Sequence, residues 1–455
     1  MKRQHALILS SLTLAMQGAW ATNGMMMEGY GPESLALGGT SMAYDNGTAA
    51  MMNNPATLQL GANGSRLDVA LGNLGPNVVA AGVKSGGTSY FMPAFGWVRK
   101  NDQFSWGVGL FGQGGMGTEY PATSALAGGT GQPVRSELSV GRVIFPLAMK
   151  VNEKINVGGT LDYTWGSMDM RLAASTNQLL GMYAFGNNTD MAGAQAALGG
   201  LMGGINSYLT SSGAGFNLGM PIRARLDFSD TNDFTGAAKS SGWTGKLGMT
   251  VQASETVRLG MAYQARTHLG DMKTSTTGAA FTLDDGTHAV PIEGQLTIKN
   301  FQMPSSVAVG MAWQVNSQLS LMMDVKSIDW SSVMASFNMS FAPAMGGDAL
   351  KFGMPQNWKD QTVTALGMAY RVDDSVVLRA GYSHSTNPVP NITVHPLFPA
   401  ITSNHVMLGA GMKVSKTGSI DFAISHAPKV TVTSDSSGVI THSQTNWQLM
   451  YTHRY

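Results

Sequence analysis

The sequence predicts an all-β protein, a 14-stranded antiparallel transmembrane β-barrel. Three observations predict this fold. Segments of alternating apolar and polar residues recur along the chain, short and long connections alternate between them, and the last segment ends on an aromatic residue, Tyr455. A strand with a period of two has one apolar and one polar face, and in a membrane barrel the apolar face meets lipid.

The first 21 residues have the pattern of a secretory signal peptide. Lys2 and Arg3 precede an apolar run over residues 6–16, and Ala19-Trp20-Ala21 supplies a small-x-small cleavage site. An N-terminal membrane anchor is the alternative, but the run is well short of the roughly 18 residues that a spanning helix needs. Cleavage after Ala21 predicts export, and a membrane barrel then implies the bacterial outer membrane.

The composition fits a barrel wall better than a soluble domain. Charged residues make up 12% of the chain, about half the usual share in soluble domains. No later segment reaches the roughly 20 apolar residues of a transmembrane helix, so a membrane-embedded chain must be a closed barrel. The net charge of +1 gives no electrostatic case for nucleic acid, and the absence of cysteine excludes disulfides and thiolate metal sites.

Fourteen segments read as strands. Val257, Leu259, Met261 and Tyr263, for example, alternate with charged, polar or small residues. Most segments reach the roughly 9–11 residues that a tilted membrane strand requires. A soluble β-sandwich also has alternating strands, but it does not explain the rhythm of the connections. The predicted strands are 65–74, 88–99, 103–112, 135–150, 155–170, 241–253, 257–270, 303–315, 318–330, 360–372, 375–384, 404–414, 418–430 and 440–455.

Short connections alternate with longer ones, and the longest spans about 171–240. Outer-membrane barrels combine short periplasmic turns with long external loops, so both termini are expected in the periplasm. Within the longest loop, Asp190 is a candidate helix N-cap, followed by an apolar stripe at helical spacing from Met191 to Leu209. The stripe is either ordinary packing or an apolar landing surface for a hydrophobic ligand.

Residues 22–64 are rich in Gly and Met and lack strand alternation. The block Gly31-Pro32-Glu33-Ser34-Leu35-Ala36-Leu37-Gly38-Gly39-Thr40 leads to Asn54-Pro55-Ala56-Thr57-Leu58. It resembles the N-terminal hatch of the FadL/TodX family of outer-membrane transport proteins, whose hatch carries an Asn-Pro-Ala motif. A second block, with Asn357-Trp358, Leu378-Arg379-Ala380-Gly381-Tyr382 and Asn387-Pro388-Val389-Pro390, resembles the C-terminal third of the same family.

The resemblance implies passive uptake of hydrophobic compounds across the outer membrane. A ligand would occupy an apolar pocket inside the barrel and leave sideways at a kink in the third strand. Gly107, Gly109 and Gly112 are the candidate kink residues, because glycine weakens a strand and permits bends. Asn54, Pro55 and Ala56 are the hatch motif, in a domain division of signal peptide 1–21, hatch 22–64 and barrel 65–455.

The implied partners are a fatty acid or hydrocarbon ligand, outer-membrane lipid and lipopolysaccharide, and the barrel-assembly machinery through the C-terminal aromatic strand. A monomer is expected. Long-chain fatty acids are the first choice of ligand, and aromatic or aliphatic hydrocarbons taken up by the same mechanism are the alternative. Arg258 and Arg379 are expected to face the lumen, where each either holds a fatty carboxylate or pairs with a carboxylate of the hatch or a neighbouring strand.

Other functions are weighed against this one. A general porin or structural barrel needs an open lumen, which a hatch would block. Gly112-Gln113-Gly114-Gly115-Met116-Gly117 fits a dinucleotide-binding pattern, but Pro121 follows instead of a helix. Asp284, Asp285 and His288 suggest general acid–base chemistry, yet Asp285-Gly286 is a typical solvated turn. We therefore expect no enzyme, no cofactor and no metal.

Overall fold

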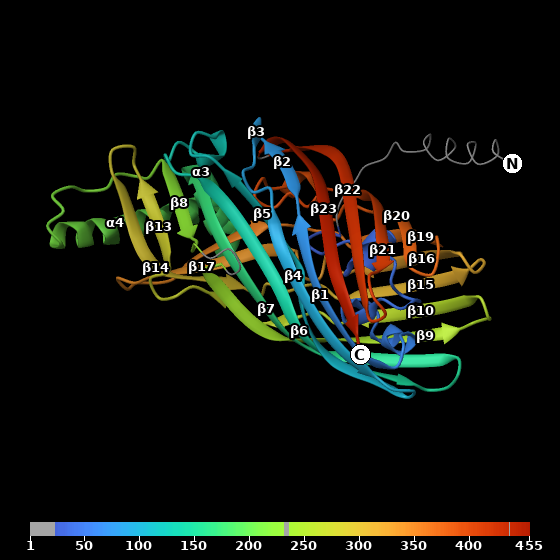
Figure 1. Cartoon of the computed structure of the whole chain (residues 1–455). Coiled ribbons are helices and arrows are strands. Elements are labelled where there is room, and N and C mark those ends of the chain that lie inside the picture. The colour runs from blue at the N-terminus through green and yellow to red at the C-terminus, as the bar shows by residue number, and fades with distance from the viewer. Residues whose placement is uncertain (1–22, 232–235, 436) are drawn as a thin grey trace.

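The computed structural model describes residues 23–231, 236–435 and 437–455 of the 455-residue chain (Figure 1). The expected signal peptide, residues 1–21, lies outside the described residues. Within these ranges no helix is both long and apolar enough to cross a membrane.

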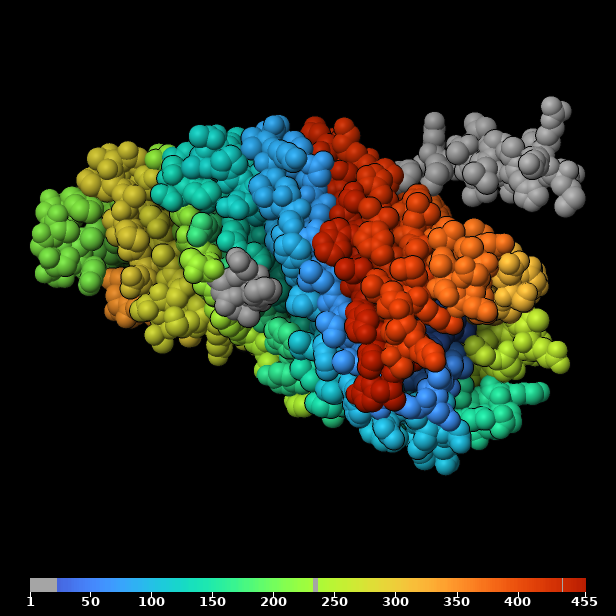
Figure 2. Space-filling view, in the orientation of Figure 1, coloured from blue at the N-terminus to red at the C-terminus, as the bar shows by residue number. Residues whose placement is uncertain are grey.

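The strands form one antiparallel sheet that closes on itself. Closure occurs where β1 (Gly64–Leu74) pairs with β23 (Gly438–Arg454), from Arg66 opposite Arg454 to Asn73 opposite Trp447. Figure 2 shows this seam as blue N-terminal strands beside red C-terminal ones. The other long strands are β4 (Tyr90–Lys100), β5 (Phe104–Tyr120), β6 (Val134–Lys150), β7 (Ile155–Ser175), β9 (Ala238–Gln252), β10 (Val257–Gln264), β15 (Ser306–Gln314), β16 (Leu319–Ile328), β19 (Gln361–Arg371), β20 (Val376–Ser385), β21 (Asn404–Lys413) and β22 (Gly418–Ser434).

The predicted number of strands is wrong, because the ring has 18 strands and not fourteen. All fourteen predicted segments overlap observed strands, but β8 (Arg223–Phe228), β13 (Ala279–Asp284), β14 (Ala289–Lys299) and β12 (Met272–Lys273) were missed. They connect β7 to β9 through the pairings β7–β8, β8–β13, β13–β14, β14–β12 and β12–β9. Nearer the short turns, β7 also pairs directly with β9, from Ile155 to Met168.

The four missed strands are too short or too interrupted to show a clear alternation of apolar and polar residues. β8 and β13 have six residues each and β12 has two, so alternation is too short to be recognised. β14 is longer, but Pro291 and Gly294 interrupt it. The remaining short strands are β2 (Pro76–Ala80), β3 (Val83–Lys84), β11 (His268–Leu269), β17 (Ser336–Pro343) and β18 (Leu350–Pro355).

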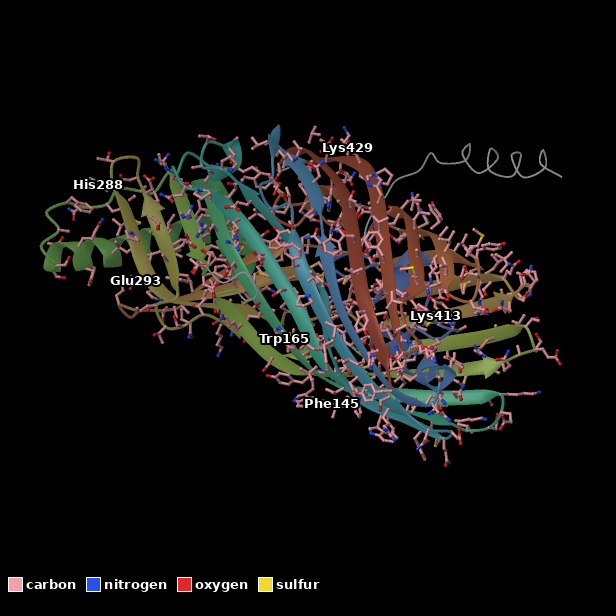
Figure 3. The ribbon with its side chains drawn as sticks, in the orientation of Figure 1. Phe145, Trp165, His288, Glu293, Lys413 and Lys429 are labelled. Carbon is pink, nitrogen blue, oxygen red and sulfur yellow. The ribbon has the colours of Figure 1, made fainter. Side chains whose placement is uncertain are left out.

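The wall has an apolar outer face and a polar inner face. Leu161, Leu247 and Leu408 are each more than half exposed, whereas the neighbouring Asp162 and Thr164 are buried inside. Figure 3 shows Phe145 on the outside of the wall, with Lys413 toward the short turns and His288 at the opposite end. This is the face assignment that alternation predicts for a wall in lipid.

Residues 23–63, called the N-terminal segment below, lie within the ring and are almost entirely buried. The segment holds the helix α2 (Pro32–Ala36) and two 3-10 helices, η1 (Gly47–Met51) and η2 (Pro55–Leu60). Helix α2 contacts β20 to β23 and η2 contacts β6, β7 and β9, which are separate parts of the wall. A segment that touches both must run across the lumen.

The end opposite the short turns is covered by helices. Helix α3 (Thr176–Asn187) begins with a capping box of Ser175 and Gln178, and α4 (Met191–Ser211) begins at Asp190, whose carboxylate accepts a hydrogen bond from the Gly193 N–H at 2.7 Å. The predicted helix is confirmed, and the stripe from Ala194 to Leu209 is buried. Two further 3-10 turns are η3 (Ala125–Ala127) and η4 (Asn391–Thr393).

Candidate functional site

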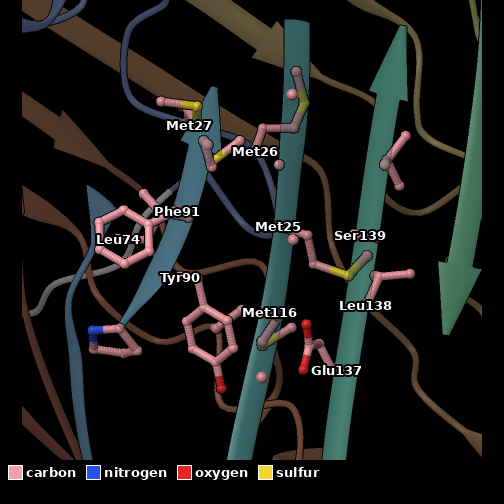
Figure 4. A pocket seen from close by; sticks show the side chains of 18 of the residues that line it. Met25, Met26, Met27, Leu74, Tyr90, Phe91, Met116, Glu137, Leu138 and Ser139 are labelled. Atoms are coloured by element: carbon pink, nitrogen blue, oxygen red, sulfur yellow. The ribbon is translucent and has the colours of Figure 1, made fainter. Parts of the chain in front are cut away.

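A cavity of about 600 Å³ lies against the inner wall (Figure 4). Its volume is within the range of roughly 300–1,000 Å³ that is usual for small-molecule sites. The lining comes mainly from the start of the N-terminal segment and from β4, β5 and β6. Pro399, Ala400 and the β23 residues His442 and Gln444 complete it. Apolar side chains dominate it, among them Met25, Met116 and Leu138.

Residues 24–28 cover one side of this cavity. The Gly115 N–H of β5 donates to the Met25 carbonyl oxygen at 3.1 Å, and Met26 forms a bridge with Gly114. Two adjacent methionines provide a flexible, polarisable surface that adapts to apolar ligands. The stretch is therefore attached to β5 by a backbone hydrogen bond and an isolated β-bridge.

Glu28 fixes the end of this stretch. Its Oε1 lies 3.0 Å from the Nε2 of His405 and accepts a hydrogen bond from the Asn446 amide at 2.9 Å. Burial acts to raise the pKa of Glu28, but the charge and hydrogen bond of His405 outweigh it and hold this pKa below its usual range. The carboxylate is thus ionised and paired.

Among the described residues that line the cavity, none is Lys or Arg. The titratable side chains present are Glu28, Tyr90, Glu137 and His442. Glu137 is paired with Arg135 at 2.5 Å. The site therefore suits an uncharged apolar ligand better than an anion.

The cavity borders a break in the pairing of β4 and β5. Pairing of these strands begins at Lys100 and Ser105 and stops at Phe95 opposite Leu110. Farther from the short turns, β4 stays paired with β1, and β5 stays paired with β6. Residues 90–94 of β4 and 111–118 of β5 are therefore not paired with each other, and we call the space between them the wall gap. Phe91 and Leu110 line the cavity but are 56% and 41% exposed on the outer surface. The residues that line the cavity at this break are therefore not covered by the protein.

A bulge shapes the β5 side of this gap. The register between β5 and β6 shifts between Gly112 and Gly114, so Gln113 is the extra residue. Of the predicted kink residues, Gly112 lies beside this shift, and Gly107 and Gly109 lie in β5 nearer the short turns. A side chain at Gly107 would overlap the Trp97 carbonyl oxygen. The role of the three glycines in opening the wall stays a prediction.

The Asn54-Pro55-Ala56 motif attaches the N-terminal segment to the wall. The fully buried Asn54 side chain accepts from the Ala56 N–H at 3.1 Å and donates to the Met42 and Met249 carbonyl oxygens at 2.7 and 3.1 Å. It thereby caps η2 and links the segment to β9. The wall residues Gly158 and Gly248 allow this approach, because a Cβ at either would collide with the motif.

The two predicted arginines lie away from the cavity. Arg379 pairs with Asp421 at 2.7 Å and with Glu33 of the N-terminal segment at 3.4 Å, and Arg258 donates to Gln252 at 2.8 Å. Neither lines the cavity. Arg379 therefore adopts the ion-pair arrangement that was the alternative to ligand binding.

Sequence reasoning missed three inward-facing cations near the cavity, of which Arg142 and Lys246 are buried and Lys326 is partly buried. Arg142, Lys246 and Lys326 line a smaller void of about 30 Å³ together with Gln113 and Tyr30. The available signal was their place in the inward-facing series of β6, β9 and β16, where an unpaired charge would be costly. Lys246 donates to the Met52 carbonyl oxygen of the N-terminal segment.

The candidate acid–base cluster is a turn. The Asp285 carboxylate accepts from the N–H groups of Gly219, Thr287 and His288, and these bonds lower the pKa of Asp285. His288 stacks on Phe216. In the described ranges there is no group of three or more side chains suited to hold a metal.

A closed β-ring with an apolar outer face and an internal apolar cavity is typical of a membrane-embedded transport barrel. The whole-chain comparison is specific: residues 9–453 match the model of the outer membrane protein transport protein family (OMPP1/FadL/TodX). The chain belongs to this family, so it is an outer-membrane transport protein and not an enzyme. The resemblance noted in its N- and C-terminal blocks is confirmed.

Solved structures agree over nearly the whole chain. The toluene transporter TodX of Pseudomonas putida superimposes with a TM-score of 0.79 at 29% identity, covering 94% of this chain and 99% of TodX. The toluene transporter TbuX of Ralstonia pickettii gives a TM-score of 0.75, also at 29% identity, with coverage of 94% and 99%.

Curated relatives are more distant or shorter. A long-chain fatty acid transport protein of Salmonella typhi is 22% identical over 335 residues, 72% of this chain and 67% of that protein. An uncharacterised Chlorobium limicola protein is 51% identical over 61 residues, which is 13% of this chain and only 30% of that protein.

Proposed function

We propose that this protein takes up uncharged hydrophobic compounds passively across the outer membrane, monoaromatic hydrocarbons foremost. The observation that carries this proposal is an apolar cavity with no Lys or Arg among its described lining residues, which borders the break in the pairing of β4 and β5. The 29% identity to two toluene transporters supports the same ligand class. Hydrocarbons thus replace fatty acids as the first choice.

The proposed route ends in the membrane and not in the periplasm. The N-terminal segment crosses the lumen and blocks the axial path, so a ligand in the cavity leaves sideways through the wall gap. Apolar solutes favour this exit, because transfer from the cavity into lipid avoids exposing their surface to water. The segment acts as a plug in this scheme.

An engineered disulfide tests the lateral exit. A Cβ placed on Gly112 would lie 3.8 Å from the Cβ of Met92 across the lower end of the gap, which matches the mean Cβ–Cβ separation of disulfides, about 3.8 Å. The double variant Met92→Cys/Gly112→Cys can therefore tie β4 to β5, and the chain has no other cysteine.

We expect the oxidised double variant to take up toluene into proteoliposomes much more slowly than the reduced one, with full recovery on reduction. The single variants, treated with the same oxidant, control for the substitutions themselves. Equal uptake by the oxidised and reduced forms would contradict lateral exit.

The ligand class is tested by native mass spectrometry of the purified protein. Toluene and a long-chain fatty acid are offered together, and retention of toluene supports the proposal. Preferential retention of the fatty acid would favour the second candidate, fatty acid uptake. The inward-facing cations Arg142, Lys246 and Lys326 near the cavity favour that candidate, since they offer charge to a carboxylate.

The plug is tested by deleting residues 22–50. The deletion should make the barrel leaky to small polar solutes in planar bilayers, while an unchanged conductance would contradict a plug. We further propose a monomer in contact with outer-membrane lipid and lipopolysaccharide, assembled by barrel-assembly machinery that binds the aromatic C-terminal strand.

A further inference from the structure

The extra residue of the β5 bulge is held at both its backbone and its side chain. Gln113 is 1% exposed although it lies beside a gap in the wall. Its carbonyl oxygen accepts a hydrogen bond from the Tyr30 hydroxyl at 2.6 Å, and its Oε1 accepts one from the Arg142 Nε at 2.8 Å. A bulged carbonyl that faces the lumen has no partner in the β-ladder, so Tyr30 supplies the bond that the ladder does not.

Arg142 makes the wall side of this arrangement rigid. Its Nη1 donates to Asp162 Oδ2 at 2.9 Å and to Gln264 Oε1 at 2.8 Å, which joins β6 to β7 and β10. The guanidinium is 1% exposed. Because charge-assisted hydrogen bonds of a buried arginine have fixed geometry, Arg142 holds the Gln113 side chain in one position relative to β7 and β10.

Tyr30 belongs to the stretch that covers the cavity. It follows Glu28, the last residue of that stretch to line the cavity, by two positions, and its carbonyl oxygen accepts from the Asn53 amide at 2.9 Å. The side chain is 6% exposed. Burial raises the pKa of Tyr30, so the phenol keeps its proton and remains a donor across the physiological range.

We propose that the Tyr30–Gln113 hydrogen bond couples occupancy of the cavity to the wall gap. A ligand that displaces residues 25–28 pulls Tyr30 away, the Gln113 carbonyl loses its partner, and the bulge beside the exit is freed. Tyr30 and Gln113 are positioning residues in this scheme, and Arg142 holds the Gln113 side chain beside β7 and β10. The inference rests on the proposed function only in treating the gap as the exit.

The test is hydrogen–deuterium exchange of the intact barrel, read over residues 110–118. Tyr30→Phe removes one hydroxyl and should raise exchange there about 5-fold, since a net hydrogen bond contributes roughly 1 kcal/mol and each 1.4 kcal/mol is tenfold. The matched control is Tyr44→Phe, whose hydroxyl donates to the Thr40 carbonyl oxygen within the N-terminal segment itself. Gln113→Leu, which removes the bond to Arg142, should raise exchange over the same residues.

Toluene supplies a readout that a merely structural role would not change. In the unmodified protein, saturating toluene should raise exchange over 110–118, and in Tyr30→Phe it should add little to an exchange that is already high. Equal exchange in Tyr30→Phe and Tyr44→Phe overturns the coupling, as does bound toluene that leaves residues 110–118 unchanged. Failure of toluene to bind at all, seen by native mass spectrometry, instead contradicts the proposed function, and the comparison of the two tyrosine variants still decides the coupling.

Discussion

Asn54→Ala is expected to detach the N-terminal segment from the wall without unfolding the barrel. The amide makes three hydrogen bonds, those with Ala56 and Met42 buried and that with Met249 partly buried. Loss of a helix N-cap costs about 1 kcal/mol. Loss of each of the two hydrogen bonds to the Met42 and Met249 carbonyl oxygens costs about 1 kcal/mol. Together these terms give about 3 kcal/mol, or roughly a 100-fold increase in local opening of the segment at 1.4 kcal/mol per tenfold.

The assay is amide exchange of residues 42–58, combined with single-channel conductance of the same preparation. The amide exchange rate should rise roughly 100-fold. The conductance recordings should show transient openings to small ions. Asn63→Ala is the matched control, because Asn63 ends the same segment but its side chain is exposed and pairs with Asp102. A change in exchange no larger than that of Asn63→Ala would refute the reasoning that the motif fastens the segment.

Two further predictions concern the same attachment. Gly248→Ala places a methyl group on Asn54 Oδ1 and should loosen residues 42–58 as Asn54→Ala does, whereas Gly199→Ala, on the open face of α4, should leave their exchange unchanged. Glu33 lies among Arg66, Arg379, Asp45 and Asp421 with its side chain 19% exposed, and desolvation raises its pKa to about 7. A carboxyl that holds its proton more tightly in the folded state stabilises attachment most below the unfolded pKa of about 4.3, and that stabilisation is lost as pH rises through about 7. Exchange over residues 30–45, corrected for intrinsic rates, should therefore increase from pH 5 to pH 8, and Glu33→Gln should abolish the increase; an unaltered pH profile would contradict this assignment.

Local patterns were sufficient to place most of the wall. Every predicted strand overlaps an observed one, from Ser65 in β1 to Tyr451 in β23, because lipid and lumen impose opposite polarities on successive residues. The helix after Asp190 was equally readable, since a cap and a 3.6-residue stripe are local signals. The turns that connect neighbouring strands were readable for the same reason.

The strands that connect β7 to β9 could not be predicted from local patterns. Its strands β8, β12 and β13 have two to six residues, and each is defined by partners distant in sequence, such as Ala280 opposite Asp227. Alternation over so few residues does not distinguish a strand from a loop. This is why fourteen strands were predicted where the ring has 18.

The candidate site shows the same division. The sequence by itself determined a membrane barrel, its lipid-facing residues and the blocks that define its family, because these are written in residue type and spacing. Only the tertiary structure decided that Gln113 turns inward at the bulge, that Arg142 meets it, and that the lining of the cavity contains Met25 and Leu138 but not Arg258 or Arg379. The physical reason is that residues from several segments together form a cavity and determine where strand pairing ends. The sequence of one segment does not show which residues of the other segments will pair with it.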